Sequence, residues 1–333
     1  MLRRSCFLFA ASSSKLEPAK ISPDAANITP SQALYKWVID NDCRISDVEL
    51  RLKPTGRGMF ATKAHRTATT LVSVPLEKFA INAERLSQLP FVKKVNPPSK
   101  GYIRDCMLNA GVLDTVMSEQ MHLAFLLATE RMNPNSELMP YFDVLPHPAV
   151  DDSAIDQMHR LTLDEGEKME WNAYREDFVN LMKHASRKWE TPIEEGRPPI
   201  QVLDWAWRTV LCRQHLLPDH GAPPVAYKKL GFVHWSMMNG DKSIWKRMLD
   251  RILNRDEVTV DYKLVPTLVP FLDAIDHAPS ANVAVEVTNR GGFGTCVELQ
   301  AIADIKPDEE IVLTFSRSST IAFTLYRFGF IPL

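Results

Sequence analysis

Hydrophobic and polar positions alternate along this chain with two different periods, and the period changes twice. Between about residues 48 and 81, short apolar runs with every second position alike are separated by prolines and by the Gly56–Gly58 turn, which predicts β-strands. From about residue 85 to residue 260, apolar residues recur mostly at helical spacing. Alternation then returns in three runs, Val283–Val287, Cys296–Ile302 and Glu310–Phe315.

This order of strands, helices and strands predicts the fold class. The first strands must find the last ones across the helical insert, which favours one composite core over two separate domains. We therefore expect an α+β protein with short β-sheets and a large helical insert at about residues 85–260.

Two helical stretches carry further expectations. A lead-in helix is predicted near Ser31–Asn41, within residues 21–45, with Ser31 as its N-cap. Farther on, an aromatic stripe recurs at helical spacing, and core packing is a commoner reason for such a stripe than a cofactor site. Its members are Trp171, Tyr174, Phe178, Leu181 and Met182.

Composition and charge exclude several classes of protein. The 333 residues are 45% hydrophobic with a formal net charge of −2, so nothing indicates a general binder of DNA or of anionic membranes. No apolar run reaches the roughly 18 residues that a transmembrane helix needs. The five cysteines are scattered without the close pairs typical of zinc sites or disulfide frameworks, so we expect a reducing compartment and no metal.

The composition of the N-terminus is typical of a targeting segment. Residues 1–20 contain Arg3, Arg4 and Lys15 among serines, with Glu17 as their single acid, which is typical of a mitochondrial presequence and predicts import into the matrix. A secretory signal is the first alternative, although the apolar stretch Cys6–Ala11 is short for one. A disordered tail with chance arginines is the second.

Five stretches, in this order and spacing, resemble one family. A Gly-x-Gly pair alone is as typical of a plain turn as of a ligand site. Together, however, the stretches resemble the SET-domain family, in the branch of Rubisco large-subunit lysine methyltransferase, which also contains an actin-histidine methyltransferase. They are Thr55–Ala61, Asn135–Pro146, Asp204–Arg213, Pro270–His277 with Asn282 following, and Glu309–Phe315 with Phe328–Phe330.

The resemblance implies a SET domain over residues 46–333, split by the helical insert, and a protein methyltransferase that uses S-adenosylmethionine. It also implies that the C-terminal domain with which larger relatives hold their protein substrate is lacking. The implied cofactor-binding residues are Gly56, Arg57, Gly58, Arg213, Asp276, His277 and Phe328.

The resemblance gives these residues their roles. The Gly56–Gly58 backbone would line the cofactor, and Arg213 would pair with its carboxylate through two parallel hydrogen bonds. A structural ion pair is the alternative for Arg213. His277, beside Asp273 and Asp276, lacks a second histidine at ligand spacing, which argues against a metal.

The chain departs from the family pattern at the catalytic centre. The catalytic tyrosine falls on Phe315, and Phe328 has replaced a second tyrosine. Phenylalanine has no oxygen with which to orient a substrate amine. Asp276 stands where the family has asparagine, and an ionised carboxylate cannot donate as an amide does. The segment Thr320–Ala322 has also changed.

Two functional hypotheses follow. The first is a SET-fold subunit with a degraded catalytic site, serving as a structural or assembly component of a mitochondrial complex. That complex would be the mitochondrial ribosome, with rRNA nearby, or a respiratory complex. The alternative is an active S-adenosylmethionine-dependent protein-lysine methyltransferase, in which Ser316 or Tyr326 has taken over the role of the lost phenol.

Overall fold

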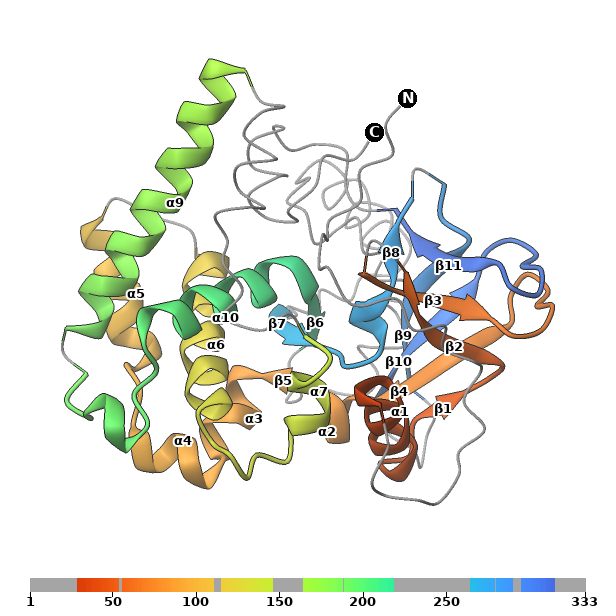
Figure 1. Cartoon of the computed structure of the whole chain (residues 1–333), viewed down its shortest axis with the longest axis horizontal. Coiled ribbons are helices and arrows are strands. Elements are labelled where there is room, and N and C mark those ends of the chain that lie inside the picture. The colour runs from red at the N-terminus through yellow and green to blue at the C-terminus, as the bar shows by residue number, and fades with distance from the viewer. Residues whose placement is uncertain are drawn as a thin grey trace, which may run out of the picture.

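The computed structural model describes most of the chain and divides it into a helical side and a strand side (Figure 1). The described residues are 29–53, 56–110, 115–145, 164–187, 189–218, 264–278, 280–289 and 295–314. The predicted presequence, Phe315 and Phe328 lie outside them.

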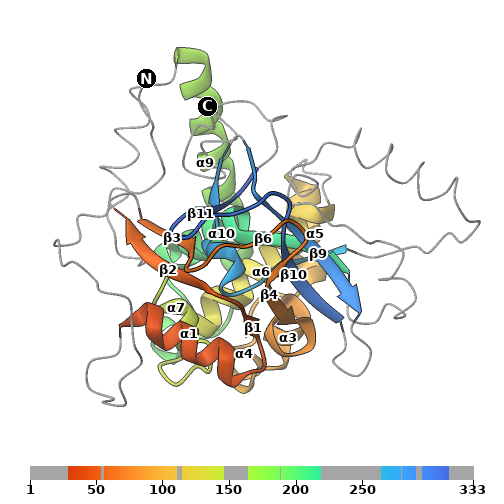
Figure 2. The same cartoon turned by 90° about the vertical axis from the view of Figure 1, so that its right-hand side faces the viewer.

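Two four-stranded sheets form the strand side, which faces the viewer in Figure 2, and each combines strands from both ends of the chain. The first has the order β1 (Arg44–Ile45), β4 (Thr70–Pro75), β10 (Thr295–Ala301) and β9 (Val283–Asn289). The second has the order β2 (Val48–Lys53), β3 (Gly56–Ala61), β11 (Glu310–Leu313) and β8 (Asp276–His277). The expected composite α+β architecture is therefore confirmed.

The second sheet buries one of its faces. Met59, Ile311 and Leu313 are at most 1% exposed and belong to the core. Because side chains alternate along a strand, their neighbours in sequence point to the other face. That other face carries most of the sheet's charged groups.

A third sheet was not expected from the sequence. It consists of β5 (Ile81–Asn82), β7 (Leu264–Leu268) and β6 (Gln214–Pro218), joined in that order by antiparallel pairs. Since β6 lies within the segment predicted to be mainly helical, the described part of the insert is not helical throughout. The sequence Gln-His-Leu-Leu-Pro follows a helix without a break, so periodicity gave no separate strand signal.

Helix α1 (Pro30–Asp40) confirms the lead-in helix but corrects its start. Thr29, not Ser31, is the N-cap, and its hydroxyl accepts a hydrogen bond from the amide of Gln32. The Gln32 side chain accepts one from the amide of Thr29, which completes a capping box. Pro30 in the first turn, with no amide hydrogen to satisfy, explains why the N-cap lies two residues earlier than predicted.

The remaining described helices form the other side of the molecule. None of the helices in the described ranges is long and apolar enough to cross a membrane. They are α2 (Leu76–Phe79), α3 (Ala83–Gln88), α4 (Pro90–Val95), α5 (Lys100–Asn109), α6 (Thr115–Arg131), α7 (Met139–Phe142), α9 (Glu165–Ser186) and α10 (Ile200–Arg213), with 3-10 turns η1 (Ile193–Glu195) and η3 (Leu272–Ala274).

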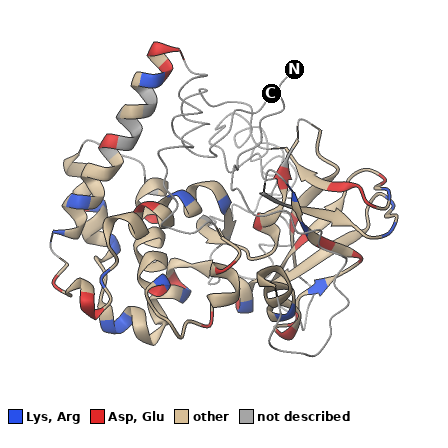
Figure 3. Cartoon of the chain, in the orientation of Figure 1, with Lys and Arg blue, Asp and Glu red and all other residues tan. Residues whose placement is uncertain are grey.

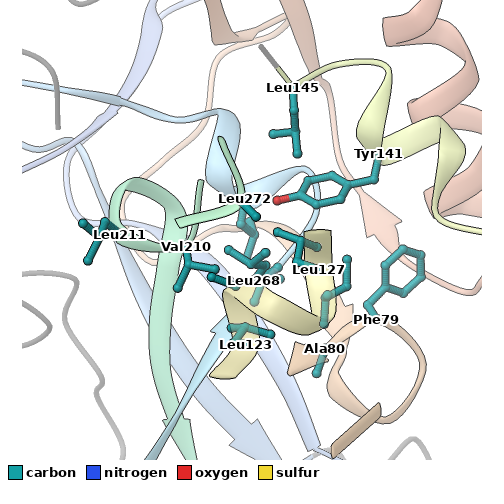
Figure 4. Packing of buried hydrophobic residues seen from close by; sticks show 14 of the residues in the cluster. Phe79, Ala80, Leu123, Leu127, Tyr141, Leu145, Val210, Leu211, Leu268 and Leu272 are labelled. Carbon is teal, nitrogen blue, oxygen red and sulfur yellow. The ribbon is translucent and has the colours of Figure 1, made fainter. Parts of the chain in front are cut away.

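Helix α6 is the centre of this side and packs against α3, α4, α5, α10 and β7. The rings of Phe178 and Trp207 stack with centroids 4.4 Å apart, which joins α9 to α10. Phe178 is therefore a core residue, as expected, while the side chains of Trp171 and Tyr174 lie outside the described part. Figure 4 shows core residues from several elements meeting, among them Leu127 of α6 and Leu268 of β7.

Candidate functional site

The candidate site lies on the polar face of the sheet β2–β3–β11–β8. Its register pairs Arg51 with Gly58, Glu310 with Phe60, and Val312 with Asp276. Paired residues share a face, and so do residues two apart on a strand. Lys53, Gly58, Glu310 and Asp276 therefore all belong to the face opposite the core.

Lys53 joins two acids on this face. Its ammonium donates hydrogen bonds to Oδ2 of Asp276 and to Oε1 of Glu310, in two ion pairs. The side chain of Lys53 is 18% exposed, against 33% for Asp276 and 31% for Glu310. Burial alone would lower the pKa of Lys53, but its hydrogen bonds and charge interactions with the two acids raise it overall. Lys53 therefore stays cationic at neutral pH.

Gly58 lies directly beneath this ion cluster of Lys53, Asp276 and Glu310. A Cβ on Gly58 would lie 2.8 Å from Oε1 of Glu310, 3.1 Å from Cε of Lys53 and 3.1 Å from the ring of Phe60. Contacts this short require a neighbour to move. The chain's own side chains therefore fill the space that a side chain at position 58 would occupy. The family resemblance placed a ligand in this space.

Two further predicted residues are described for their backbone alone. Arg57 of β3 pairs with Leu52 of β2, and His277 of β8 pairs with Leu313 of β11. Gly56, the first glycine of the motif, pairs with Lys53. The sheet therefore brings the backbone of the motif close to the base of the Lys53 side chain.

Arg213 has a partner of its own within the chain. It ends α10, and its Nη1 donates a 2.6 Å hydrogen bond to the backbone carbonyl of Asp273 in η3. The buried carboxylate of Asp273 accepts a hydrogen bond from the hydroxyl of Tyr141. Burial raises the pKa of Asp273, although the nearby charge of Arg213 opposes the shift. One N–H group of Arg213 is thus committed to the backbone of η3, and its charge acts on the buried carboxyl of Asp273.

These contacts connect the two parts of the site. Asp273 lies three residues before Asp276, and η3 leads directly into β8. Arg213 therefore anchors the turn that places Asp276 beside Lys53. Sequence reasoning assigned no role to Lys53, Tyr141 or Asp273, because their partners lie far along the chain.

Asn282 acts as a structural link at the same edge. Its Nδ2 donates a 2.8 Å hydrogen bond to the carbonyl of Glu310, and its Oδ1 accepts one of 2.9 Å from the amide of Val312. The side-chain amide thus takes the place of a backbone partner for β11. Thr314, the last described residue before Phe315, donates a 2.9 Å hydrogen bond to the carbonyl of Ala278. The described chain ends beside the segment that follows β8.

A separate hollow of about 410 Å³ lies in the helical side and shares no residue with the ion cluster. His122 lines it, and burial, aided by the charge of Lys100, lowers the pKa of His122 to about 4. Among the described residues, no group of three His, Cys, Asp or Glu side chains is placed to hold a metal ion. Figure 3 shows that both the helical side and the strand side carry Lys or Arg together with Asp or Glu.

No protein-family model and no curated protein matches this chain. Solved structures do match it. The SET domain of LSMT bound to lysine and AdoHcy has a TM-score of 0.57 at 15% identity, over 91% of this chain and 57% of that one. Rubisco LSMT bound to AdoMet has a TM-score of 0.54 at 14% identity, over 91% and 56%.

A third structure, Rubisco LSMT bound to sinefungin and monomethyllysine, has a TM-score of 0.53 at 15% identity, over 93% of this chain and 57% of that one. This chain therefore spans less than two thirds of the length of the structures it matches. Likeness at this identity establishes the fold: the chain has the SET fold of methyltransferases. The predicted branch and the predicted lack of a C-terminal domain stay predictions.

Proposed function

We propose that this protein is a SET-fold subunit whose methyl-transfer site is degraded and which serves as a structural or assembly component of a mitochondrial complex. The mitochondrial ribosome, where rRNA would lie nearby, and a respiratory complex are the two candidate hosts. The fold in this proposal is established by the matched structures. What we propose beyond the fold is that the catalytic activity has been lost and that the protein belongs to one of these two complexes.

One observation carries it: the described side chains assigned to the cofactor are engaged with the chain itself. Asp276 is ion-paired with Lys53, and Arg213 donates to the carbonyl of Asp273. The space above Gly58 is filled by Lys53, Glu310 and Phe60. These contacts within the chain stand where the resemblance would have Asp276, Arg213 and Gly58 contact S-adenosylmethionine.

The sequence adds a chemical argument. With Phe315 at the position of the family's catalytic tyrosine, no phenol oxygen can accept or donate a hydrogen bond to a substrate amine there. Loss of one positioned polar group commonly slows a reaction by orders of magnitude. The composition of residues 1–20 supports the mitochondrial matrix as the location.

The alternative, an active S-adenosylmethionine-dependent lysine methyltransferase in mitochondria, has one observation in its favour. The matched structures hold AdoMet, AdoHcy or sinefungin, two of them together with lysine or a methylated lysine. In this alternative, Ser316 or Tyr326 supplies the missing hydroxyl.

Methyl transfer from labelled S-adenosylmethionine to a mitochondrial extract separates the two. The full chain and its Phe315→Tyr variant are compared, and the native protein is followed by sedimentation of a mitochondrial lysate. We expect no transfer by the unaltered chain and co-sedimentation with a large assembly. Transfer by the unaltered chain at a rate that Phe315→Tyr does not exceed would establish the alternative.

A further inference from the structure

We infer that Lys53 is a lock on the polar face of sheet β2–β3–β11–β8: a ligand can reach the backbone of Gly58 only after the ammonium of Lys53 has left Asp276 and Glu310. This inference deepens the proposed function, because it says how the same site is kept from its ligand. It rests on the proposed assignment of Gly58 and Asp276 to that site. It does not require that methyl transfer be lost.

The geometry of the ion cluster supports the lock. Lys53 comes from β2, Asp276 from β8 and Glu310 from β11, so the three ion-paired groups span the width of the sheet. Between β2 and β11 runs β3, which carries Gly58. The Lys53 side chain must therefore pass over β3 to reach both acids. Its Cε accordingly lies 3.1 Å from the position of a Cβ on Gly58.

The cluster is also placed so that it can open. All three side chains keep some contact with solvent, at 18% to 33% exposure, so water can replace their mutual hydrogen bonds. Ion pairs that remain in contact with water contribute little free energy. Lys53 has a flexible four-carbon stem, whereas the backbone beneath it is held in paired strands. The device therefore moves a side chain and leaves the sheet unchanged.

A neighbouring ion cluster on the same face provides a matched comparison. Arg51 lies two residues before Lys53 and pairs with Glu49 and Asp308. Its guanidinium carbon lies 5.0 Å from the ring centre of Phe60. Both cations thus extend from β2 and bridge two acids, although Asp308 lies in the turn before β11 and not in a strand. Only Lys53, however, is among the three groups nearest to a Cβ built on Gly58.

The lock has a quantitative consequence. A ligand that binds only the open form sees an apparent affinity reduced by the fraction of open molecules. If about one molecule in ten is open, removing the lock tightens binding about tenfold.

The test measures binding of S-adenosylhomocysteine to the full chain by titration calorimetry. Lys53→Ala removes both the ammonium and the stem that covers Gly58, whereas Glu310→Ala removes one of the two anchors of Lys53 and leaves Asp276. Arg51→Ala is the matched control. We expect Lys53→Ala to bind about tenfold more tightly than the unaltered chain, Glu310→Ala to tighten binding by a smaller factor, and Arg51→Ala to stay within about twofold of the unaltered chain. Thermal melting establishes that each variant is folded.

Three results would overturn the lock: equal affinity of the folded lock variants and the unaltered chain, equal tightening by Arg51→Ala and Lys53→Ala, or no binding by any variant. None of them depends on catalysis. The proposed function fails instead if the unaltered chain transfers methyl groups, so the two failures are distinguishable.

Discussion

Tyr141 and Asp273 are 132 residues apart in the chain, yet the hydroxyl of Tyr141 donates a hydrogen bond to the buried carboxylate of Asp273. Burial raises the pKa of both groups. Arg213 binds the backbone carbonyl of the same aspartate. The end of α10, the short helix α7 and the 3-10 turn η3 therefore meet at Asp273, three residues before Asp276.

The first prediction concerns this buried hydrogen bond. Tyr141→Phe leaves the carboxylate of Asp273 without a hydroxyl donor in a site that excludes water. We expect the free energy of unfolding to fall by about 1–3 kcal/mol, the cost of an unsatisfied buried polar group. Urea denaturation measures it. Tyr35→Phe, which removes a phenol oxygen from a half-buried ring in α1, should cost less; equal losses would contradict the role assigned to Tyr141.

The second prediction concerns the space above Gly58. Gly58→Ala places a methyl group where Glu310 and Lys53 now lie, so both flexible side chains must shift and their ion pairs weaken. We expect a loss of about 1–2 kcal/mol in the free energy of unfolding, in the range for overpacking.

Gly101 provides the matched control for this substitution. A Cβ on Gly101 meets nothing within 4 Å, and the residue lies in α5. Gly101→Ala should therefore stabilise the protein by about 0.5–1 kcal/mol through helix propensity. If the two substitutions have the same effect, the space above Gly58 is not filled as described.

The third prediction concerns pH. Burial lowers the pKa of His215 from 6.5 to about 3, so the folded protein keeps this ring neutral while the unfolded chain protonates it below about pH 6.5. Its contribution to stability is fully present above that pH and is lost as the pH falls toward 3. The loss is about 1.4 kcal/mol for each pH unit in that window.

Urea denaturation at several pH values checks this prediction. His215→Leu removes the titrating ring, so its unfolding free energy should fall less steeply than that of the unaltered chain between about pH 6.5 and 4. Parallel curves for the two proteins would show that His215 does not titrate as described.

The fourth prediction concerns Asn282. Asn282→Asp retains an acceptor for the amide of Val312 but loses the donor to the carbonyl of Glu310. We expect a loss of about 0.5–1.5 kcal/mol in unfolding free energy, because the partly buried carbonyl of Glu310 loses this donor and the new carboxylate faces the carboxylate of Glu309. Hydrogen exchange at the amides of β11 should quicken at the same time. Unchanged exchange there would mean that the side-chain amide does not hold the strand.

The local elements and the fold class could be predicted from the pattern of apolar and polar residues. Alternation of apolar residues predicted β2, β4, β9, β10 and β11, because a strand with one buried face must alternate. It predicted β3 only from Met59 to Ala61; the expected turn at Gly56–Gly58 is wrong, because these residues pair with β2 as the start of β3. The helical spacing of Phe178, Leu181 and Met182 predicted α9 and its buried face for the same kind of reason. The ordered motifs predicted the SET fold, which the matched structures confirm.

The contacts of the candidate site residues could not be predicted in this way, because they depend on tertiary packing. Lys53 meets partners 223 and 257 residues away, and periodicity carries no information about which distant charges will pair. The sequence pattern did not predict sheet β5–β7–β6, because β6 follows α10 directly, with no turn residues between them. The glycine at position 58 indicated that some group could approach the backbone closely there, because glycine has no side chain in the way. The sequence does not say whether a ligand or a side chain of the protein lies against this backbone. In the structure, the side chain of Lys53 lies there.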